Sequence, residues 1–277
     1  FLREALKMEK VAFLGPKGTF SHEAASKVSD NIVAHCSIQS VMESIVNGDC
    51  SKGLVPIENS IEGSVTITLD LLIHNFDLQI ENEVVISINH NLLVKPGTKI
   101  EDITDVYSHS QALAQCQPFL EKMNVNKHFT LSTAAATKQI LELDNAASIG
   151  SLKAAEYYNL EPIAKNIQNN DTNQTRFVTL SKKDHEPTGH DKTSIAFSLF
   201  NDAEAGALYE ILKIFSKENI NLTKIESRPS KIGLGTYIFF IDLEGHRLTE
   251  KISIILEEVE NKTSFFKLLG SYPIYEE

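Results

Sequence analysis

Short apolar runs alternate with amphipathic stretches along roughly the first 180 residues of the chain. Apolar runs of this length predict strands, and apolar residues spaced three or four positions apart predict helices. We expect strands at residues 11–14, 53–57, 84–94, 106–107, 129–131, 147–149 and 177–180. Helices are expected from about residue 21, after a capping-box spacing at Ser40 and Glu43, at residues 111–120 and from about residue 133. This alternation predicts an α/β fold with a largely parallel sheet.

The remaining part of the chain has a different order of elements. Strands are expected at residues 194–200, 222–225, 236–243 and 265–269, with helical patterns at 208–215 and 252–259. The order strand, helix, strand, strand, helix, strand is typical of the ferredoxin-like arrangement. A polar segment, residues 181–192, contains Pro187 and Gly189 and is the expected linker. We therefore predict two domains, residues 10–182 and 193–277.

Composition narrows the possible partners. The formal net charge of −11 disfavours nucleic acid, which needs a basic face, but it permits a small anionic ligand. No apolar run approaches the ~18 residues of a membrane span, and the charged start does not resemble a signal peptide. We expect a cytoplasmic protein without nucleic-acid or membrane partners.

The cysteines and histidines give no metal or disulfide pattern. Cys36, Cys50 and Cys116 are far apart and form no CxxC pair, so we expect buried reduced thiols. His22 and Glu23 begin an HExxH-like stretch, but Ser26 stands where the second histidine would be. No metal is therefore expected.

Four polar stretches follow predicted strands. They are GPKGTFSHEAA at 15–25, PIENSIEGSV at 56–65, YSHSQALAQC at 107–116 and STAAA at 132–136. Ligands of open α/β sheets bind beyond the carboxyl ends of strands, and hydroxyls, amides and backbone N–H groups suit a small polar ligand. A tight turn or a helix cap explains the first two stretches equally well. The glycine loop has neither the P-loop pattern nor GxGxxG, so it predicts no nucleotide site.

The stretch TNQTRFV, residues 172–178, contains the only arginine between Arg3 and Arg228. Arg176 either makes a structural ion pair or binds a substrate carboxylate with paired hydrogen bonds. The stretch alone does not separate these alternatives.

Together these stretches resemble the prephenate dehydratase family from about Lys10 to the C-terminus. FLGPKGTFSHEAA, GLVPIENSIEGSV, YSHSQAL and NQTRFV are similar to family motifs and occur in family order. GALYEIL at 206–212, ESRP at 226–229 and KLLGSYP at 267–273 resemble an ACT regulatory domain. One departure is Ser110, where the family usually has proline. No chorismate mutase segment precedes Val11, so we expect a monofunctional enzyme.

The resemblance implies a two-lobed catalytic domain, similar to periplasmic binding proteins, and a ferredoxin-like ACT domain. It implies conversion of prephenate to phenylpyruvate with no cofactor or metal. Thr175 would donate to the leaving hydroxyl, and an alcohol is a poor acid, so we expect an oriented donor. Arg176 would hold a substrate carboxylate or brace Thr175. Glu58 is either protonated in the cleft or faces away and pairs structurally.

The other implied site residues fall into two groups. Asn59 and Gln115 join the catalytic group, and the implied substrate-binding residues are Thr19, Phe20, Ser21, Ser60, Ser108, Thr133, Ala134 and Phe177.

The resemblance also implies feedback by L-phenylalanine, bound between two ACT domains of a homodimer or homotetramer. The implied effector residues are Gly206, Ala207, Leu208, Glu226, Ser227, Arg228 and Pro229. Two alternatives remain open at this point. They are an arogenate dehydratase and a non-catalytic amino-acid sensor.

Overall fold

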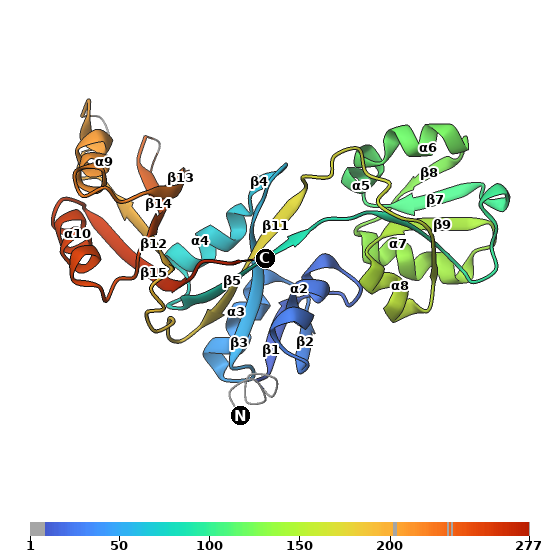
Figure 1. Cartoon of the computed structure of the whole chain (residues 1–277), viewed down its shortest axis with the longest axis horizontal. Coiled ribbons are helices and arrows are strands. Elements are labelled where there is room, and N and C mark those ends of the chain that lie inside the picture. The colour runs from blue at the N-terminus through green and yellow to red at the C-terminus, as the bar shows by residue number, and fades with distance from the viewer. Residues whose placement is uncertain (1–8, 202–203, 232, 234, 277) are drawn as a thin grey trace. The chain divides into compact units, whose positions relative to one another are not determined.

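The structure is a computed structural model that describes residues 9–201, 204–231, 233 and 235–276 (Figure 1). The chain forms two compact units. The first comprises Phe1–Thr66 and Val85–Phe177, and the second comprises Ile67–Val84 and Val178–Glu277. Each unit therefore takes its residues from two separate segments of the chain.

The first sheet has the strand order β2-β1-β3-β11-β5, and β4 pairs with β3. Strand β1 runs parallel to both of its neighbours, and Val11, Ala12 and Phe13 on it are fully buried. Strands β5 and β11 each continue from one unit into the other. The strands are β1 (Val11–Leu14), β2 (Ile32–His35), β3 (Lys52–Asn59), β4 (Gly63–Ser64), β5 (Gln79–Ser87) and β11 (Gln174–Ser181). The helices that follow them in sequence are α2 (Phe20–Val28), α3 (Ile38–Asn47) and α4 (Thr66–His74).

Helix α3 begins one turn earlier than the capping-box prediction. Ser37 is the N-cap, and its hydroxyl accepts from the Ser40 N–H at 3.0 Å. The Ser40 hydroxyl in turn accepts from the Ser37 N–H at 3.1 Å. The predicted start at Ser40 was wrong because a serine here takes the third helical position that glutamate or glutamine usually fills.

The second sheet has the order β10-β6-β9-β7-β8. Strand β7 runs parallel to β8 and β9, whereas β6 runs antiparallel to β9 and β10. The prediction of a largely parallel sheet is therefore wrong for this sheet, which is mixed. Its strands are β6 (Asn91–Val94), β7 (Asp105–Ser108), β8 (Asn126–Phe129), β9 (Ala146–Gly150) and β10 (Glu161–Ala164).

Helices cover both faces of the second sheet (Figure 1). Leu92 and Val94 of β6 pack with α5 and α6 residues, and Leu93 between them packs with α8 residues. Side chains of a strand alternate between faces, so both faces are buried. The helices are α5 (Ser110–Gln115), α6 (Gln117–Met123), α7 (Thr133–Gln139) and α8 (Leu152–Tyr158), with short 3₁₀ turns η1 (Ile100–Asp102) and η2 (Ile140–Glu142).

The single strand predicted at residues 84–94 is two strands in two sheets. Strand β5 ends at Ser87 in the first sheet, and β6 begins at Asn91 in the second. All of β6 is buried, and so are Val84 and Ile86 near the end of β5, so the apolar run continues across the change of sheet. Periodicity alone does not reveal such a crossing.

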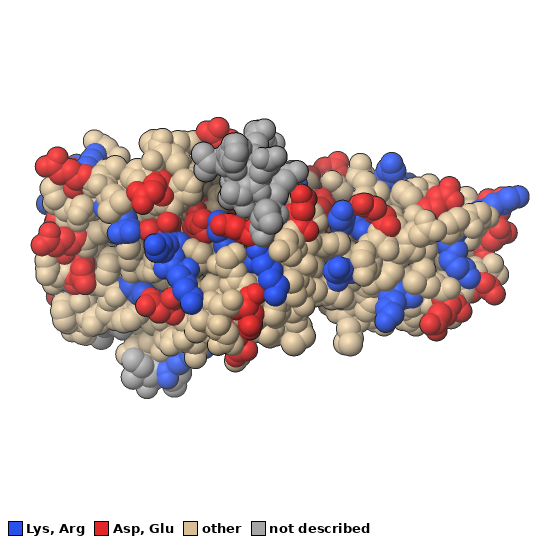
Figure 2. All heavy atoms as spheres, turned by 90° about the horizontal axis from the view of Figure 1, so that it is seen from below, with Lys and Arg blue, Asp and Glu red and all other residues tan. Residues whose placement is uncertain are grey.

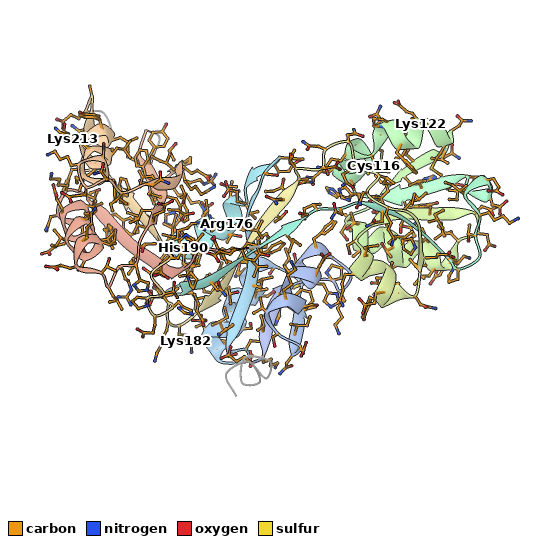
Figure 3. The ribbon with its side chains drawn as sticks, viewed as in Figure 1. Cys116, Lys122, Arg176, Lys182, His190 and Lys213 are labelled. Atoms are coloured by element: carbon orange, nitrogen blue, oxygen red, sulfur yellow. The ribbon has the colours of Figure 1, made fainter. Side chains whose placement is uncertain are left out.

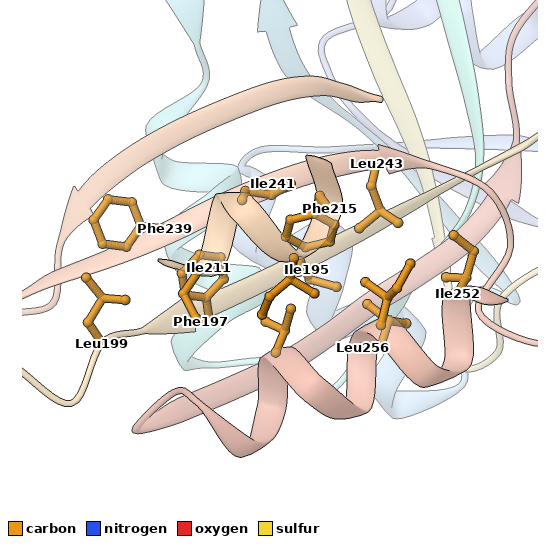
Figure 4. Close-up of a cluster of buried hydrophobic side chains, with 13 residues drawn as sticks. Ile195, Phe197, Leu199, Ile211, Phe215, Phe239, Ile241, Leu243, Ile252 and Leu256 are labelled. Atoms are coloured by element: carbon orange, nitrogen blue, oxygen red, sulfur yellow. The ribbon is translucent and has the colours of Figure 1, made fainter. Parts of the chain in front are cut away.

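The second unit contains the predicted ferredoxin-like order, which is confirmed. Its antiparallel sheet has the order β13-β14-β12-β15. Figure 4 shows its buried core, in which Phe197, Phe215 and Ile241 belong to a strand, a helix and a second strand. The elements are β12 (Asp191–Ser198), α9 (Ala207–Lys217), β13 (Leu222–Pro229), β14 (Tyr237–Glu244), α10 (Glu250–Asn261) and β15 (Phe265–Pro273).

Helix α4 and the first part of β5 also belong to this second unit. Lys192 on β12 donates to both carboxylate oxygens of Glu83 on β5, each at 3.1 Å. Lys267 on β15 donates to the carbonyls of Leu72 and Phe76, each at 2.8 Å, at the end of α4. Cations at a helix C-terminus offset its partial negative charge. These polar contacts tie α4 and β5 to the βαββαβ sheet.

Charge is mixed on the surface shown in Figure 2. Acidic and basic side chains are interspersed there, and no continuous basic surface is seen on that face. Within the described residues, every helix is too short or too polar to cross a bilayer.

Candidate active site

A cavity of about 500 Å³ lies in the first unit. Its lining combines residues from all four polar stretches and from TNQTRFV, and it includes Phe20, Asn59, Gln115, Thr133 and Thr175. Asn59 ends β3 and Thr175 stands near the start of β11, the neighbouring strand. Gln115 ends α5 beside the second sheet. The fold thus brings together five residues that the sequence places far apart.

Asn59 is held in one orientation by the backbone. Its side-chain oxygen Oδ1 accepts from the N–H groups of Ile61 at 3.0 Å and Glu62 at 2.9 Å. Backbone nitrogens only donate, so the amide cannot be reversed. Its nitrogen Nδ2 therefore donates to Asn173 Oδ1 at 2.8 Å and Thr175 Oγ1 at 2.9 Å, and lies 3.1 Å from the Gln174 carbonyl.

This contact determines the role of the Thr175 hydroxyl. Because the Asn59 nitrogen can only donate, Thr175 Oγ1 is the acceptor between them. Its own hydrogen has no other partner among the described residues. The side chain lines the cavity and the residue is 9% exposed. Thr175 is therefore prepared to donate a hydrogen bond to a ligand.

Gln115 presents a second donor. Its oxygen Oε1 accepts from Asn173 Nδ2 at 3.0 Å and contacts His90 Nε2 at 2.9 Å. Its amide nitrogen Nε2 has no partner within the described part of the chain, and the residue lines the cavity. Two neutral donors, from Gln115 and Thr175, are thus free for a ligand.

The cavity lining has no lysine or arginine among the described residues. Glu62 is the carboxylate that lines it. Arg176 instead pairs with Glu58, whose Oε2 lies 3.7 Å from its guanidinium nitrogen NH1. Their side chains are 11% and 36% exposed, respectively, and neither lines the cavity. Figure 3 marks Arg176 on β11. Successive residues of a strand alternate between faces, which separates Arg176 from Thr175.

Residues 11–185 match the prephenate dehydratase family, and residues 199–261 match the ACT domain family. The first match covers more than half of the chain. This chain belongs to the prephenate dehydratase family.

Similar proteins agree with this assignment along nearly the whole chain. A prephenate dehydratase of Methanocaldococcus jannaschii is 44% identical over 277 residues, which cover 96% of this chain and 98% of the relative. The crystal structure of an Arthrobacter aurescens prephenate dehydratase in complex with L-Phe has a TM-score of 0.87 at 33% identity, covering 96% of this chain and 90% of that one.

A third neighbour has the same fold and a different described activity. The structure of GqqA, described as a novel type of quorum quenching acylase, has a TM-score of 0.87 at 25% identity, covering 96% of this chain and 98% of that one. The fold alone therefore does not determine the reaction, and the residues of the cavity carry that argument.

The remaining substrate-binding predictions fall outside the cavity lining. Ser108 is fully buried and donates to the Ile149 carbonyl at 2.9 Å. The Thr19 hydroxyl caps α2 by accepting from the His22 N–H at 3.2 Å. Ser60 accepts from the Gln174 N–H at 2.9 Å and so holds the loop before β11. Three others are buried without lining the cavity, and they are Ser21, Ala134 and Phe177.

Sequence reasoning missed several residues that line the cavity. They are Asn173, His90, His109, Gln111, Leu131 and Ser132. Asn173 belongs to the NQTRFV motif, so the motif itself was the available signal. His90 lies at the junction of β5 and β6, inside the run that was predicted to be one strand.

The burial of the three cysteines agrees with the prediction at two positions and contradicts it at one. Cys50 and Cys116 are buried, and burial raises the pKa of Cys116 to about 12, so this thiol stays protonated. Cys36 is exposed, because it lies in the polar turn before α3, and the prediction that it is buried was wrong. In the described residues, no group of three or more metal-ligating side chains is placed to hold a metal ion.

The implied effector residues lie on two elements of the second unit. Gly206 has a φ of 89° and is the N-cap of α9, in whose first turn Ala207 and Leu208 lie. The run from Glu226 to Pro229 ends the edge strand β13. Ser227 and Pro229 on this strand are exposed. Arg228 donates to Asp70 of α4 at 3.3 Å, and Lys231 reaches the same carboxylate at 2.8 Å.

Proposed function

We propose that the protein converts prephenate to phenylpyruvate. The bond from the ring to its carboxylate breaks and releases carbon dioxide, and that electron pair enters the ring as it becomes aromatic. The bond from the ring to the hydroxyl breaks at the opposite position, and the leaving hydroxide takes a proton from solvent to become water. The observation that carries this proposal is the Thr175 hydroxyl, which accepts from Asn59 and keeps its hydrogen for a ligand.

Thr175 donates to the leaving hydroxyl in this proposal. An alcohol does not transfer a proton fully at neutral pH, so its contribution is an oriented hydrogen bond that strengthens as negative charge develops. Asn59 supports this role because it donates to the threonine oxygen and makes the hydroxyl hydrogen more acidic. Gln115 adds its free amide nitrogen as a further donor.

Strong contacts are expected on the pyruvyl carboxylate and weak ones on the ring carboxylate. The carboxylate that departs becomes neutral carbon dioxide, so holding its charge would stabilise the substrate more than the transition state. Among the described residues the cavity lining offers neutral donors and no lysine or arginine, which supports weak contacts on the ring carboxylate. Arg176 braces β11 through Glu58, and its effect on catalysis passes through the position of Thr175. We also propose that the predicted substrate-binding residues that do not line the cavity contact the substrate when the cleft is closed.

L-Phenylalanine acts as a feedback effector in this proposal, at Gly206–Leu208 and Glu226–Pro229. The ACT family match and the phenylalanine complex of the Arthrobacter aurescens protein support it. Arg228 contacts Asp70 on α4, and α4 follows directly in sequence from Val65 of the cavity lining. An effector carboxylate that competes for Arg228 would alter this contact, and the coupling of two sites is typically ~1–3 kcal/mol.

The remaining proposals concern cellular location, oligomeric state and domain boundaries. We propose a cytoplasmic homodimer or homotetramer, with residues 10–182 catalytic and residues 193–277 regulatory. Strand β13 is an edge strand whose alternate residues are exposed, and such edges are available for pairing with a second chain.

Purified protein mixed with prephenate tests the proposed function directly. Phenylpyruvate is followed by its ultraviolet absorbance in alkali, with and without L-phenylalanine, and arogenate is tried in parallel. We expect product from prephenate and its suppression by phenylalanine. Product from arogenate alone would indicate the aminated substrate, and phenylalanine binding without turnover of either substrate would indicate a sensor. Cleavage of an acyl group from a quorum-sensing signal, with no product from either substrate, would indicate the acylase activity instead.

A further inference from the structure

His90 lies at the cavity in a position that the surrounding backbone holds firmly. Its N–H donates to Gln168 Oε1 at 2.9 Å, and its carbonyl accepts from the Ile167 N–H at 2.9 Å. The ring of Phe20 meets the imidazole edge-on, with the centroids 5.7 Å apart. The residue is only 4% exposed. A side chain held this closely can position its neighbours.

The direction of each hydrogen bond between Thr175 and His90 follows from one fixed end. The backbone N–H groups of Ile61 and Glu62 require Asn59 to present its nitrogen to Asn173. Asn173 must then present its oxygen to Asn59 and its nitrogen to the Gln115 oxygen.

His90 lies at the other end of this hydrogen-bond network, next to Gln115. The Gln115 oxygen can only accept, so the His90 nitrogen Nε2 carries the hydrogen in their 2.9 Å contact. The imidazole is therefore in the Nε2–H form.

The other ring nitrogen agrees with this assignment. Nδ1 of His90 is buried and has no hydrogen-bond partner among the described residues. A proton there would place a donor, and a charge, in a site without an acceptor, which is costly. Burial lowers the pKa of His90 in spite of the Gln115 hydrogen bond that raises it. The ring is thus neutral near pH 7.

We propose that His90 is a positioning residue for the reaction. Its Nε2–H holds the Gln115 oxygen and so keeps the Gln115 nitrogen available to the substrate. Donors stand at both ends of this network, the backbone N–H groups of Ile61 and Glu62 at one end and His90 Nε2–H at the other, so the three amides between them have one orientation. The kinetic part of this inference rests on the proposed function.

The tautomer of His90 can be measured without any substrate. In a long-range ¹H–¹⁵N spectrum of the full-length labelled protein at pH 7, the His90 signals are assigned by their loss in His90→Phe or His90→Gln. We expect a protonated Nε2 and a bare Nδ1. An Nδ1–H tautomer or an imidazolium ion would overturn the proposal, whatever reaction the protein catalyses.

Kinetic measurements distinguish a positioning role of His90 from a purely structural one. His90→Phe removes the donor and keeps an aromatic ring, so we expect kcat to fall about tenfold with KM changed less than about twofold. His90→Gln places an amide N–H near the position of Nε2 and should restore most of that loss. His128→Phe is a matched control, because His128 bonds Asp105 and does not line the cavity.

A double-mutant cycle shows whether His90 acts through Gln115. In a Gln115→Leu background, His90→Phe should cost less than about twofold further in kcat. An equal loss in both backgrounds, or no recovery in His90→Gln at an unchanged melting temperature, would contradict the proposal. If the wild-type protein does not turn over prephenate, the proposed function is rejected. The spectroscopic measurement of the His90 tautomer would still test the hydrogen-bond network.

Discussion

In the proposed mechanism, Thr175 is a weakly acidic group that Asn59 prepares for catalysis. The threonine oxygen accepts from Asn59, and that amide is itself fixed by two backbone N–H groups. The hydroxyl hydrogen is left for a ligand in the cavity, and the proposal requires no reorganisation of this donor when charge develops. Preorganised donors of this kind supply a large part of catalysis in many enzymes.

A substitution at Thr175 tests this role. Thr175→Val keeps the shape and removes the hydroxyl, so kcat should fall about 10²–10⁴-fold with an unchanged melting temperature. Thr175→Ser keeps the donor and should retain far more activity. Equal losses in both variants, measured as initial rates with prephenate, would show that the hydroxyl is not used.

Arg176 and Glu58 allow a second test, because each contacts the other outside the cavity. If Arg176 braces β11, Arg176→Lys and Glu58→Gln should each lower kcat by about tenfold or less, and the double variant should be no worse than the poorer single one. A large rise in KM for Arg176→Lys alone would instead place the guanidinium on a substrate carboxylate. Steady-state kinetics on the three variants distinguish these outcomes.

Part of the site was predictable from the resemblance of short motifs to the family. Asn59, Gln115 and Thr175 belong to polar stretches that follow or begin strands, and the cavity brings all three together. The sequence left open whether Glu58 is protonated in the cleft or faces away and pairs structurally. In the structure Glu58 pairs with Arg176. His90 was not found because one histidine inside an apolar run carries no spacing signal. Its role depends on a contact with Gln115, 25 positions away.

At the scale of elements, α4 is held to the βαββαβ sheet by charged groups. Burial raises the pKa of Asp70, but the hydrogen bond from Lys231 and the charge of Arg228 outweigh it, so the pKa lies below its ordinary value of 3.8. A carboxylate with a lowered folded-state pKa stabilises the fold above its ordinary pKa. That stabilisation is lost as the pH falls through the lowered value.

Asp70→Asn tests this contribution. The variant should lower the free energy of unfolding by about 1–2 kcal/mol at pH 7, since Lys231 is more than half exposed and its contact is screened. The difference from the wild type should shrink as the pH falls below 3.8. Denaturant unfolding at several pH values measures both effects, and a difference that stays constant with pH would contradict this account of Asp70.

The elements themselves were predicted unevenly. The βαββαβ order and the strand of residues 11–14 followed from periodicity, because apolar faces there are regular. Helix α4 was not predicted, since six of its nine residues are buried and it has no polar face to give a period. The mixed pairing of the second sheet also escaped prediction, because strand direction depends on partners that are distant in sequence.

At the scale of the whole molecule, the compact units do not follow the order of the chain. Residues 67–84 join the second unit although the predicted regulatory domain begins at residue 193. Contacts such as Lys192 with Glu83 span more than a hundred residues, so no local pattern indicates them. Residues 67–84 therefore pack with the βαββαβ fold, although residues on either side of this segment line the cavity.

Gly206 offers a test of the proposed effector site. Its φ of 89° favours glycine, and a Cβ there would meet no atom within 4 Å, so a side chain would strain the start of α9 without a clash. In Gly206→Val, the phenylalanine concentration for half-inhibition should rise by about tenfold or more. An unchanged inhibition curve would place the effector elsewhere.

The most direct measurement counts both products of the proposed reaction. Purified protein is incubated with prephenate at pH 7, and phenylpyruvate and carbon dioxide are quantified in the same samples over time. The account predicts equal amounts of the two products, and both formed about 10²–10⁴-fold more slowly by Thr175→Val. Phenylpyruvate that fails to form, or carbon dioxide released without it, would contradict decarboxylating dehydration at this cavity.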